Sequence, residues 1–180
     1  MQDKQQDIDM FSKHYEENKE SVLNYIFYRV GFDRAVAEDL TSEIFIKAFN
    51  AFHTFDRERS FKTWIFAIAH NHLINFYYSK KNVLSLDDAL KVTKDYDENN
   101  ALERKMTVEK IFELLEGLPE SQKSLVIMRY VNDLSYSEIA NILGKEEGAI
   151  RTALSRITTS LRNKFEIKFK EPNAGKYERQ

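Results

Sequence analysis

The chain has 180 residues, of which 42% are hydrophobic and 13% aromatic, and this apolar content supports a folded core and argues against wholesale disorder. It contains no cysteine, which excludes disulfide frameworks and thiolate metal sites, and its net charge of −2 argues against binding nucleic acid by bulk electrostatics. No apolar run approaches the roughly 20 residues of a membrane span, and the start MQDKQQDIDMF lacks signal-peptide features, so we expect a cytoplasmic protein without membrane insertion.

The first part of the chain, residues 1–82, predicts a domain of three helices. Apolar residues recur at helical spacing across residues 8–30, and Gly31 follows them as a stop. Asp33 is placed to cap a second helix, and Ser60 a third. With five glycines and two prolines in the whole chain, long stretches stay uninterrupted, which favours helices over a turn-rich β fold.

The second predicted helix has an acidic face. Four residues line up at helical steps on the side opposite its apolar stripe: Asp39, Glu43, Ile46 and Asn50. A solvated helix face is the default interpretation, since one exposed isoleucine is ordinary. Carboxylates around an isolated apolar side chain would also suit the docking of a basic helical partner.

The third predicted helix lies in a stretch without acidic residues. Residues 59–82 carry four basic side chains and no acidic ones, and the helix is apolar nearly all round. A central helix of a bundle would look like this. Aromatic residues interleaved with lysines and amides are also typical of surfaces that bind single-stranded DNA. His70 and His72 point to different sides of the helix, so no metal site is expected there.

The second part of the chain predicts another small helical domain. Residues 83–100 lose the apolar periodicity and gather Asp, Asn and Ser, which indicates an acidic, flexible linker. Periodicity returns over residues 101–167, with a break and a restart at Gly117 and Pro119. Residues 168–180 are typical of a frayed tail. The expected fold is all-α, with two small helical domains joined by a linker.

The segment LSYSEIANILGKEEGAIRTALSRI predicts a helix-turn-helix. Ser135 and Glu138 have the spacing of a capping box, and Gly144 suits a left-handed C-cap. The following helix carries an apolar stripe, and hydroxyls and arginines cover its opposite side: Arg151, Thr152, Ser155, Arg156, Thr159 and Arg162. Such a face suits the major groove of DNA, although a solvated amphipathic hairpin fits the same pattern.

The order of these features resembles the RNA polymerase sigma factors of the sigma-70 family, of the small extracytoplasmic-function (ECF) type. The segments AEDLTSEIFIKAF and FDRERSFKTWIFAIAHN are similar to region 2 of that family. The segments LPESQKSLVIMRYVNDLSYSEIANILG and EEGAIRTALSRITTSLRNKF are similar to region 4. The resemblance implies a non-enzymatic factor that binds core RNA polymerase and directs promoter recognition and the initiation of transcription.

The resemblance also implies roles for individual residues. Docking on the β′ clamp helices of core polymerase is implied for Glu38, Asp39, Ser42, Glu43 and Ile46. Contact with the melted −10 element is implied for Phe55, Lys62, Asn71, Asn75, Lys80 and Lys81. Contact with the duplex −35 element is implied for Arg129, Arg151, Thr152, Ser155 and Arg156.

The implied partners are core RNA polymerase, through its β′ clamp helices and β flap, and promoter DNA in duplex and single-stranded form. An anti-sigma factor is a further candidate partner, and no cofactor or metal is expected. The alternative is an autonomous helix-turn-helix transcriptional regulator that binds duplex DNA. An enzyme is disfavoured, because the sequence has no glycine-rich phosphate loop, nucleophile constellation or metal-spaced ligand set.

Overall fold

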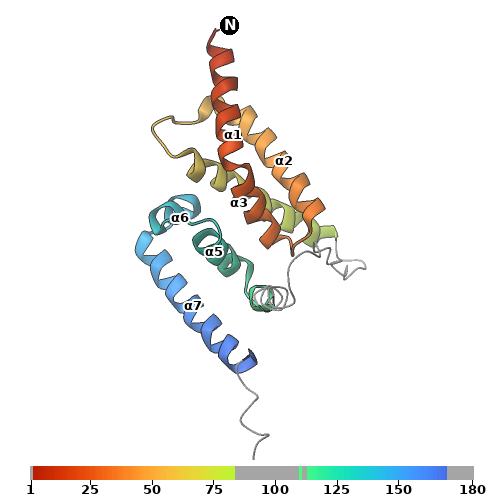
Figure 1. The fold of residues 1–180 in the computed structure, drawn as a ribbon, viewed down its shortest axis with the longest axis vertical. Coiled ribbons are helices and arrows are strands. Elements are labelled where there is room, and N and C mark those ends of the chain that lie inside the picture. Colours follow the sequence, from red (N-terminus) through yellow and green to blue (C-terminus); the bar gives the residue numbers. More distant parts are fainter. Residues whose placement is uncertain (1, 84–109, 111–112, 170–180) are drawn as a thin grey trace, which may run out of the picture.

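The computed structural model describes residues 2–83, 110 and 113–169, and the structural statements below concern these residues. Their regular secondary structure is helical, which confirms the expected all-α fold class (Figure 1). The helices are α1 (Gln2–Arg29), α2 (Arg34–Ala51), the short 3₁₀ helix η1 (Phe52–Thr54), α3 (Phe61–Val83), α5 (Glu120–Tyr130), α6 (Tyr136–Leu143) and α7 (Glu147–Phe169). We call α1 to α3 the N-terminal bundle and α5 to α7 the C-terminal bundle.

Several sequence predictions fall on residues that the structure does not describe. The predicted linker, residues 83–100, lies outside the described residues except for its first residue, which ends α3. The predicted tail, residues 168–180, is described only at its first two residues, where α7 ends. Of the helix expected up to residue 116, residues 110 and 113–116 are described, and they are helical.

The predicted caps of the N-terminal bundle are confirmed. The side chain of Asp33 accepts a hydrogen bond from the backbone N–H of Val36 at 3.0 Å, and Ser60 Oγ accepts one from the N–H of Thr63 at 3.3 Å. After α1 the chain turns through two left-handed residues, Gly31 with φ 76° and its neighbour with φ 66°. Glycine adopts this conformation without steric cost, which explains why α1 ends there.

Aromatic rings fill one end of the N-terminal bundle. Phe11 of α1 meets four rings edge-on at centroid distances of 5.1 to 6.5 Å: Phe45, Phe49, Phe52 and Phe61. Edge-to-face pairs contribute about 0.5–1.5 kcal/mol each beyond the burial of their area. Because these rings come from all three helices and from η1, they fix the turn that leads into α3.

The C-terminal bundle has the predicted helix-turn-helix. Ser135 Oγ accepts from the backbone N–H of Glu138 at 3.2 Å, and the Glu138 carboxylate accepts from the N–H of Ser135 at 2.7 Å, which confirms the capping box. Gly144 ends α6 in the left-handed region with φ 60°. The apolar stripe of α7 is buried at Ile150, Leu154 and Ile157. The polar side of α7 is therefore turned to solvent.

The two bundles pack against each other, with α1 against α5 and α3 against α6 (Figure 1). Asn132, after α5, donates its side-chain N–H to the backbone carbonyl of Ser21 at 2.7 Å. The Lys62 ammonium of α3 donates to the backbone carbonyl of Asn132 at 2.8 Å. Arg29 of α1 pairs with Glu120 of α5 at 3.0 Å. The sequence did not predict these contacts, which join segments about 70 to 110 residues apart.

A buried arginine occupies the centre of this boundary. The Arg29 side chain is 2% exposed, and its guanidinium donates to Glu120 and to the Tyr25 hydroxyl. It also donates to Ser124 Oγ and lies over the Tyr77 ring at 5.6 Å. Burial of a charge without partners would cost several kcal/mol, so these contacts are what allow the guanidinium to lie here.

Candidate nucleic-acid interface

The predicted docking face lies on the exposed side of α2. The structure places all five of its residues on the surface: Glu38, Asp39, Ser42, Glu43 and Ile46. Ile46 is 62% exposed, which is high for a large apolar side chain. Glu38 pairs with Arg34 one turn earlier, and Ser42 Oγ donates back to the carbonyl of Glu38. The face thus presents carboxylates around one apolar side chain, as the sequence predicted.

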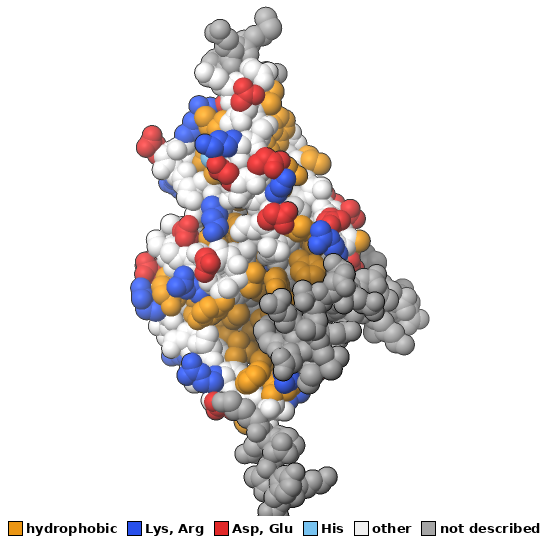
Figure 2. Space-filling model, in the orientation of Figure 1, with side chains coloured by type: hydrophobic (Ala, Val, Ile, Leu, Met, Phe, Trp, Pro, Cys, Tyr) orange, Lys and Arg blue, Asp and Glu red, His pale blue; other side chains and the backbone are white. Residues whose placement is uncertain are grey.

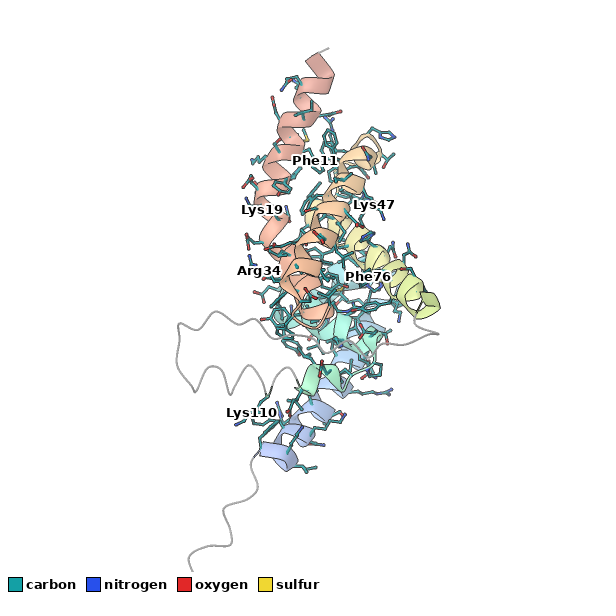
Figure 3. All side chains as sticks on the ribbon, turned by 90° about the vertical axis from the view of Figure 1, so that its right-hand side faces the viewer. Phe11, Lys19, Arg34, Lys47, Phe76 and Lys110 are labelled. Carbon is teal, nitrogen blue, oxygen red and sulfur yellow. The ribbon has the colours of Figure 1, made fainter. Side chains whose placement is uncertain are left out.

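A groove of about 460 Å³ separates this face from α3. Asp39 and Glu43 line it from α2, and Asn75 lines it from α3. Lys47 and Phe76 also line the groove and lie on the same side of the two helices (Figure 3). Two sets of residues that the sequence assigned to different roles therefore meet at one surface.

His72 lies between Lys47 and Glu43 in this groove. The Lys47 ammonium lies 2.6 Å from His72 Nδ1, and Glu43 Oε2 lies 2.9 Å from His72 Nε2. Burial and the nearby Lys47 charge lower the pKa of His72, so the ring is neutral at pH 7. An ammonium can only donate, so Nδ1 accepts and the proton of the neutral ring lies on Nε2.

Five of the six residues predicted to contact the melted strand lie on α3, and Phe55 precedes it. Asn71 and Asn75 are exposed and one turn apart, whereas Lys62 is half-buried because it bonds to the C-terminal bundle. Lys80 and Lys81 belong to α3, but their side chains lie outside the described part of the chain.

Phe55, which precedes α3, is packed inward. Its side chain is only 9% exposed and stacks on Phe52 at 5.8 Å, with Trp64 at 5.0 Å. The ring is therefore turned into the protein in this arrangement, and its contact with the melted strand stays a prediction. The position of an aromatic residue in a turn can be read from the sequence, but the direction in which its ring packs cannot.

The polar face of α7 carries the predicted duplex-binding residues. Arg151, Thr152, Ser155 and Arg156 are all exposed, as the helical spacing predicted. Arg151 forms an ion pair with Glu147 at 2.6 Å, and Thr152 Oγ1 donates to the carbonyl of Gly148. Figure 2 shows both basic and acidic side chains along the edge of the molecule formed by α6 and α7. The positive charge of the arginines on α7 is therefore partly balanced by nearby carboxylates such as that of Glu147.

Arg129, the fifth predicted duplex-binding residue, is linked to Arg151 through an aromatic ring. The guanidinium carbon of Arg129 lies 4.9 Å from the centre of the Tyr136 ring, and that of Arg151 lies 4.6 Å from it. Arg129 also donates to the carbonyl of Leu134 at 2.9 Å. Sequence reasoning missed Tyr136, because the contact joins α5, α6 and α7 and has no signature in the spacing of residues.

His70 lies at the boundary between the bundles, in a cavity of about 410 Å³ that Lys145 and Arg156 also line. Its Nδ1 lies 3.1 Å from the Tyr25 hydroxyl. Burial, followed by the charges of Arg29 and Lys145, lowers the pKa of His70 from 6.5 to about 4. His70 is therefore neutral at pH 7.

Within the described residues, no cluster of three or more His, Asp or Glu side chains is arranged to hold a metal ion. Among the same residues, none of the helices combines the length and the apolar character needed to span a membrane.

Two family models match the chain. The family model described as Sigma-70 region 2 matches residues 14–83, and the model described as Sigma-70, region 4 matches residues 109–160. The RNA polymerase sigma factor YlaC of Bacillus subtilis is 31% identical over 159 residues, which are 86% of this chain and 88% of that protein. The ECF RNA polymerase sigma factor BldN of Streptomyces coelicolor is 33% identical over 86% of this chain, which spans 60% of that longer relative.

Two solved structures have a similar fold. The sigma factor RpoE of Bartonella quintana, in a co-crystal with the anti-sigma factor NepR, gives a TM-score of 0.74 at 19% identity over 88% of this chain and 98% of that one. CnrH, in complex with the cytosolic domain of CnrY, gives a TM-score of 0.67 at 16% identity over 88% of each chain. At these identities the likeness shows a shared fold.

Proposed function

Because the chain belongs to the sigma-70 family of RNA polymerase sigma factors, ECF type, we propose that its three exposed surfaces divide the work of promoter recognition between them. Sigma factors direct RNA polymerase to promoters for the initiation of transcription, and the chain performs this non-enzymatic function. Its own residues bind and position, and the synthesis of RNA belongs to the polymerase.

The α2 face is proposed to dock on core polymerase. Its carboxylates, with Ile46 at 62% exposure among them, suit a basic helical surface such as the β′ clamp helices. The Glu43 carboxylate lies beside His72 and lines the groove. The C-terminal bundle is proposed to contact the β flap.

The exposed strip of α3 is proposed to hold the melted −10 strand. Asn71 and Asn75 offer amides to base edges, and Lys62, Lys80 and Lys81 offer charge to the backbone. Contacts with unstacked bases offset part of the unstacking free energy, which is a few kcal/mol. The Lys62 ammonium is bound to Asn132 in the packed arrangement. It becomes available only when the two bundles separate, so promoter binding is proposed to include that separation.

The α7 face is proposed to read the −35 element. The exposure of its arginines and hydroxyls is the observation that carries the proposed function. Arg151 and Arg156, exposed on the second helix of a helix-turn-helix, have the length and planar donors to pair with guanine in the major groove. Thr152 and Ser155 lie between them with small hydroxyls. Arg129 is proposed to contact a phosphate at the edge of the same groove.

The proposed domains are residues 1–82, for docking and −10 contact, and residues 101–167, for −35 contact. Residues 83–100 are proposed to act as the linker between them and residues 168–180 as a tail. A chain of this function works with RNA polymerase in the cytoplasm. Because RpoE of Bartonella quintana is bound to an anti-sigma factor, an anti-sigma factor is also a proposed partner of this chain.

Run-off transcription with core polymerase tests the proposal. Core polymerase is incubated with fragments of the source genome, with and without the chain, and the start sites are mapped. Discrete, chain-dependent start sites are expected. Arg156→Ala should lower transcription from them while the chain still co-purifies with core polymerase. Absence of stimulation on every fragment would contradict the proposed function, and loss of core binding in Arg156→Ala would contradict the division between surfaces.

A further inference from the structure

Tyr136 is the one residue in the described part of the chain whose ring meets two of the proposed DNA-binding arginines. The guanidinium carbons of Arg129 and Arg151 lie 4.9 and 4.6 Å from the ring centre. Each arginine has one further contact, Arg129 with the carbonyl of Leu134 and Arg151 with the carboxylate of Glu147. Each guanidinium is therefore held by a ring on one side and an oxygen on another.

The ring itself has a fixed place. Tyr136 is the first residue of α6, directly after Ser135, whose capping box fixes the backbone at this point. Its side chain is half-buried and packs against the core of the C-terminal bundle. A face of an aromatic ring attracts a cation electrostatically, so a fixed ring restricts where both guanidinium groups lie.

We propose that Tyr136 is a positioning residue for −35 recognition, and this rests on the proposed function of the α7 face. The ring sets the guanidinium groups of Arg129 and Arg151, which come from α5 and α7, at a defined separation before DNA is bound. A long flexible side chain loses rotamer freedom when it binds, and a side chain that is already ordered loses less. Tyr136 thus strengthens promoter binding through two other residues.

Glu147 has a complementary part in this arrangement. Its carboxylate holds Arg151 from the start of α7, at 2.6 Å, and the exchange of this ion pair for a contact with DNA leaves the ring contact in place. The ring is uncharged, so it orders the arginine without competing with phosphate for it. A carboxylate partner must be displaced before Arg151 can bind DNA, whereas the Tyr136 ring does not have to be.

Three substitutions test the proposal in holoenzyme assembled from the full chain and core polymerase. Tyr136→Leu removes the ring, Tyr136→Phe restores it without the hydroxyl, and Tyr130→Leu is the matched control at an exposed tyrosine outside the proposed surfaces. For a promoter found by the run-off experiment, Tyr136→Leu should weaken binding by about fivefold or more. Tyr136→Phe should recover most of that loss, and Tyr130→Leu should bind as the parent chain does.

A double-substitution cycle and a spectroscopic measurement complete the test. If Tyr136 acts through Arg151, the effect of Tyr136→Leu should be smaller in the Arg151→Ala background than in the parent chain. In the free chain, nitrogen-15 relaxation of the arginine Nε groups should show both side chains more mobile in Tyr136→Leu and not in Tyr136→Phe.

Unchanged arginine mobility in Tyr136→Leu would overturn the positioning role even if the chain proved not to be a promoter-binding factor. Equal losses in Tyr136→Phe and Tyr136→Leu would overturn it as well, because they would assign the effect to the hydroxyl. Unfolding of each variant by urea separates either outcome from a general loss of structure. Failure of the parent chain to support run-off transcription would contradict the proposed function, and the relaxation measurement would still decide the role of the ring.

Discussion

Arg29 of α1 and Glu120 of α5 are joined across the boundary between the two bundles, with Nη2 and Oε2 3.0 Å apart. The two side chains are unlike in their surroundings, because that of Arg29 is 2% exposed and that of Glu120 is 47% exposed. The arginine is thus a buried charge whose acidic partner reaches it from the rim of the interface. The boundary between the bundles therefore contains a buried charge and its partner beside the apolar contacts.

Glu120→Gln should destabilise the packed arrangement. The substitution keeps the shape of the side chain but removes the acidic partner of the buried Arg29 guanidinium and of the Lys123 ammonium, which lies 3.0 Å from Oε1. A weakened buried donor costs about 1–3 kcal/mol. Urea unfolding at pH 7 measures it. Glu116→Gln, at an exposed position just before α5, is the control and should change stability little. Equal stability of the two variants would show that Glu120 does not stabilise the interface.

His70 should make the packing sensitive to acid. Its pKa is about 4 in the folded chain and 6.5 ordinarily, so the unfolded chain binds the proton more tightly. This contribution to stability is complete above pH 6.5 and is lost as the pH falls toward 4. Tyr25, Arg29, Lys145 and Glu120 surround the ring or line its cavities.

The comparison of thermal unfolding for the parent chain and His70→Asn between pH 7 and pH 4 isolates this effect, since the carboxyl groups titrate in both. The parent chain should lose more stability over this range than the variant. A loss of 1 kcal/mol corresponds to about 2–4 °C in Tm for a chain of this size. Parallel pH profiles would mean that burial of His70 does not penalise its protonated form.

A covalent link between the bundles should block promoter-directed transcription. The chain has no native cysteine, so Ser21→Cys with Asn132→Cys introduces a single pair of thiols. In the parent chain Asn132 Nδ2 lies 3.3 Å from Ser21 Oγ. Oxidation, or a short thiol cross-linker, should hold Lys62 against the C-terminal bundle and away from DNA.

Transcription should fall at least tenfold in the linked protein and recover after reduction of the disulfide. The two single-cysteine variants, treated with the same oxidant, are the controls. If the linked protein transcribes as well as the reduced one, the separation of the bundles is not needed for promoter binding.

Glu147→Gln should raise affinity for duplex DNA of any sequence. The carboxylate of Glu147 occupies the Arg151 guanidinium at 2.6 Å, and its removal leaves that charge to phosphates. Glu146→Gln removes the same charge from the neighbouring exposed position, at which no ion pair is formed within the described residues. Fluorescence anisotropy at several salt concentrations should show about twofold tighter nonspecific binding for Glu147→Gln than for Glu146→Gln. Identical binding curves for the two variants would show that the gain in affinity comes from net charge alone and not from release of Arg151.

The sequence predicted the local structure well where the signal is local. The caps at Asp33, Ser60 and Ser135 and the left-handed stop at Gly144 were read correctly, because each depends on backbone groups within a few residues. The exposed face of α7 was read correctly because helical periodicity alone decides which side faces the core.

Phe55 and Tyr136 mark where this reasoning ends. Both are aromatic residues beside predicted DNA-binding surfaces, yet the first packs inward and the second holds arginines from two other helices. The direction of a ring depends on which neighbours the fold brings to it, and those neighbours come from distant parts of the chain.

By itself the sequence determined the all-α class, the helix-turn-helix and the two surfaces that carry acidic and basic side chains, since these follow from periodicity, caps and charge along single helices. Only the tertiary structure decided that Arg29 is buried against Glu120, that Lys62 is held by Asn132, and that one ring joins Arg129 to Arg151. The physical reason is that such contacts join helices far apart in the chain, and their geometry depends on how packed bundles meet.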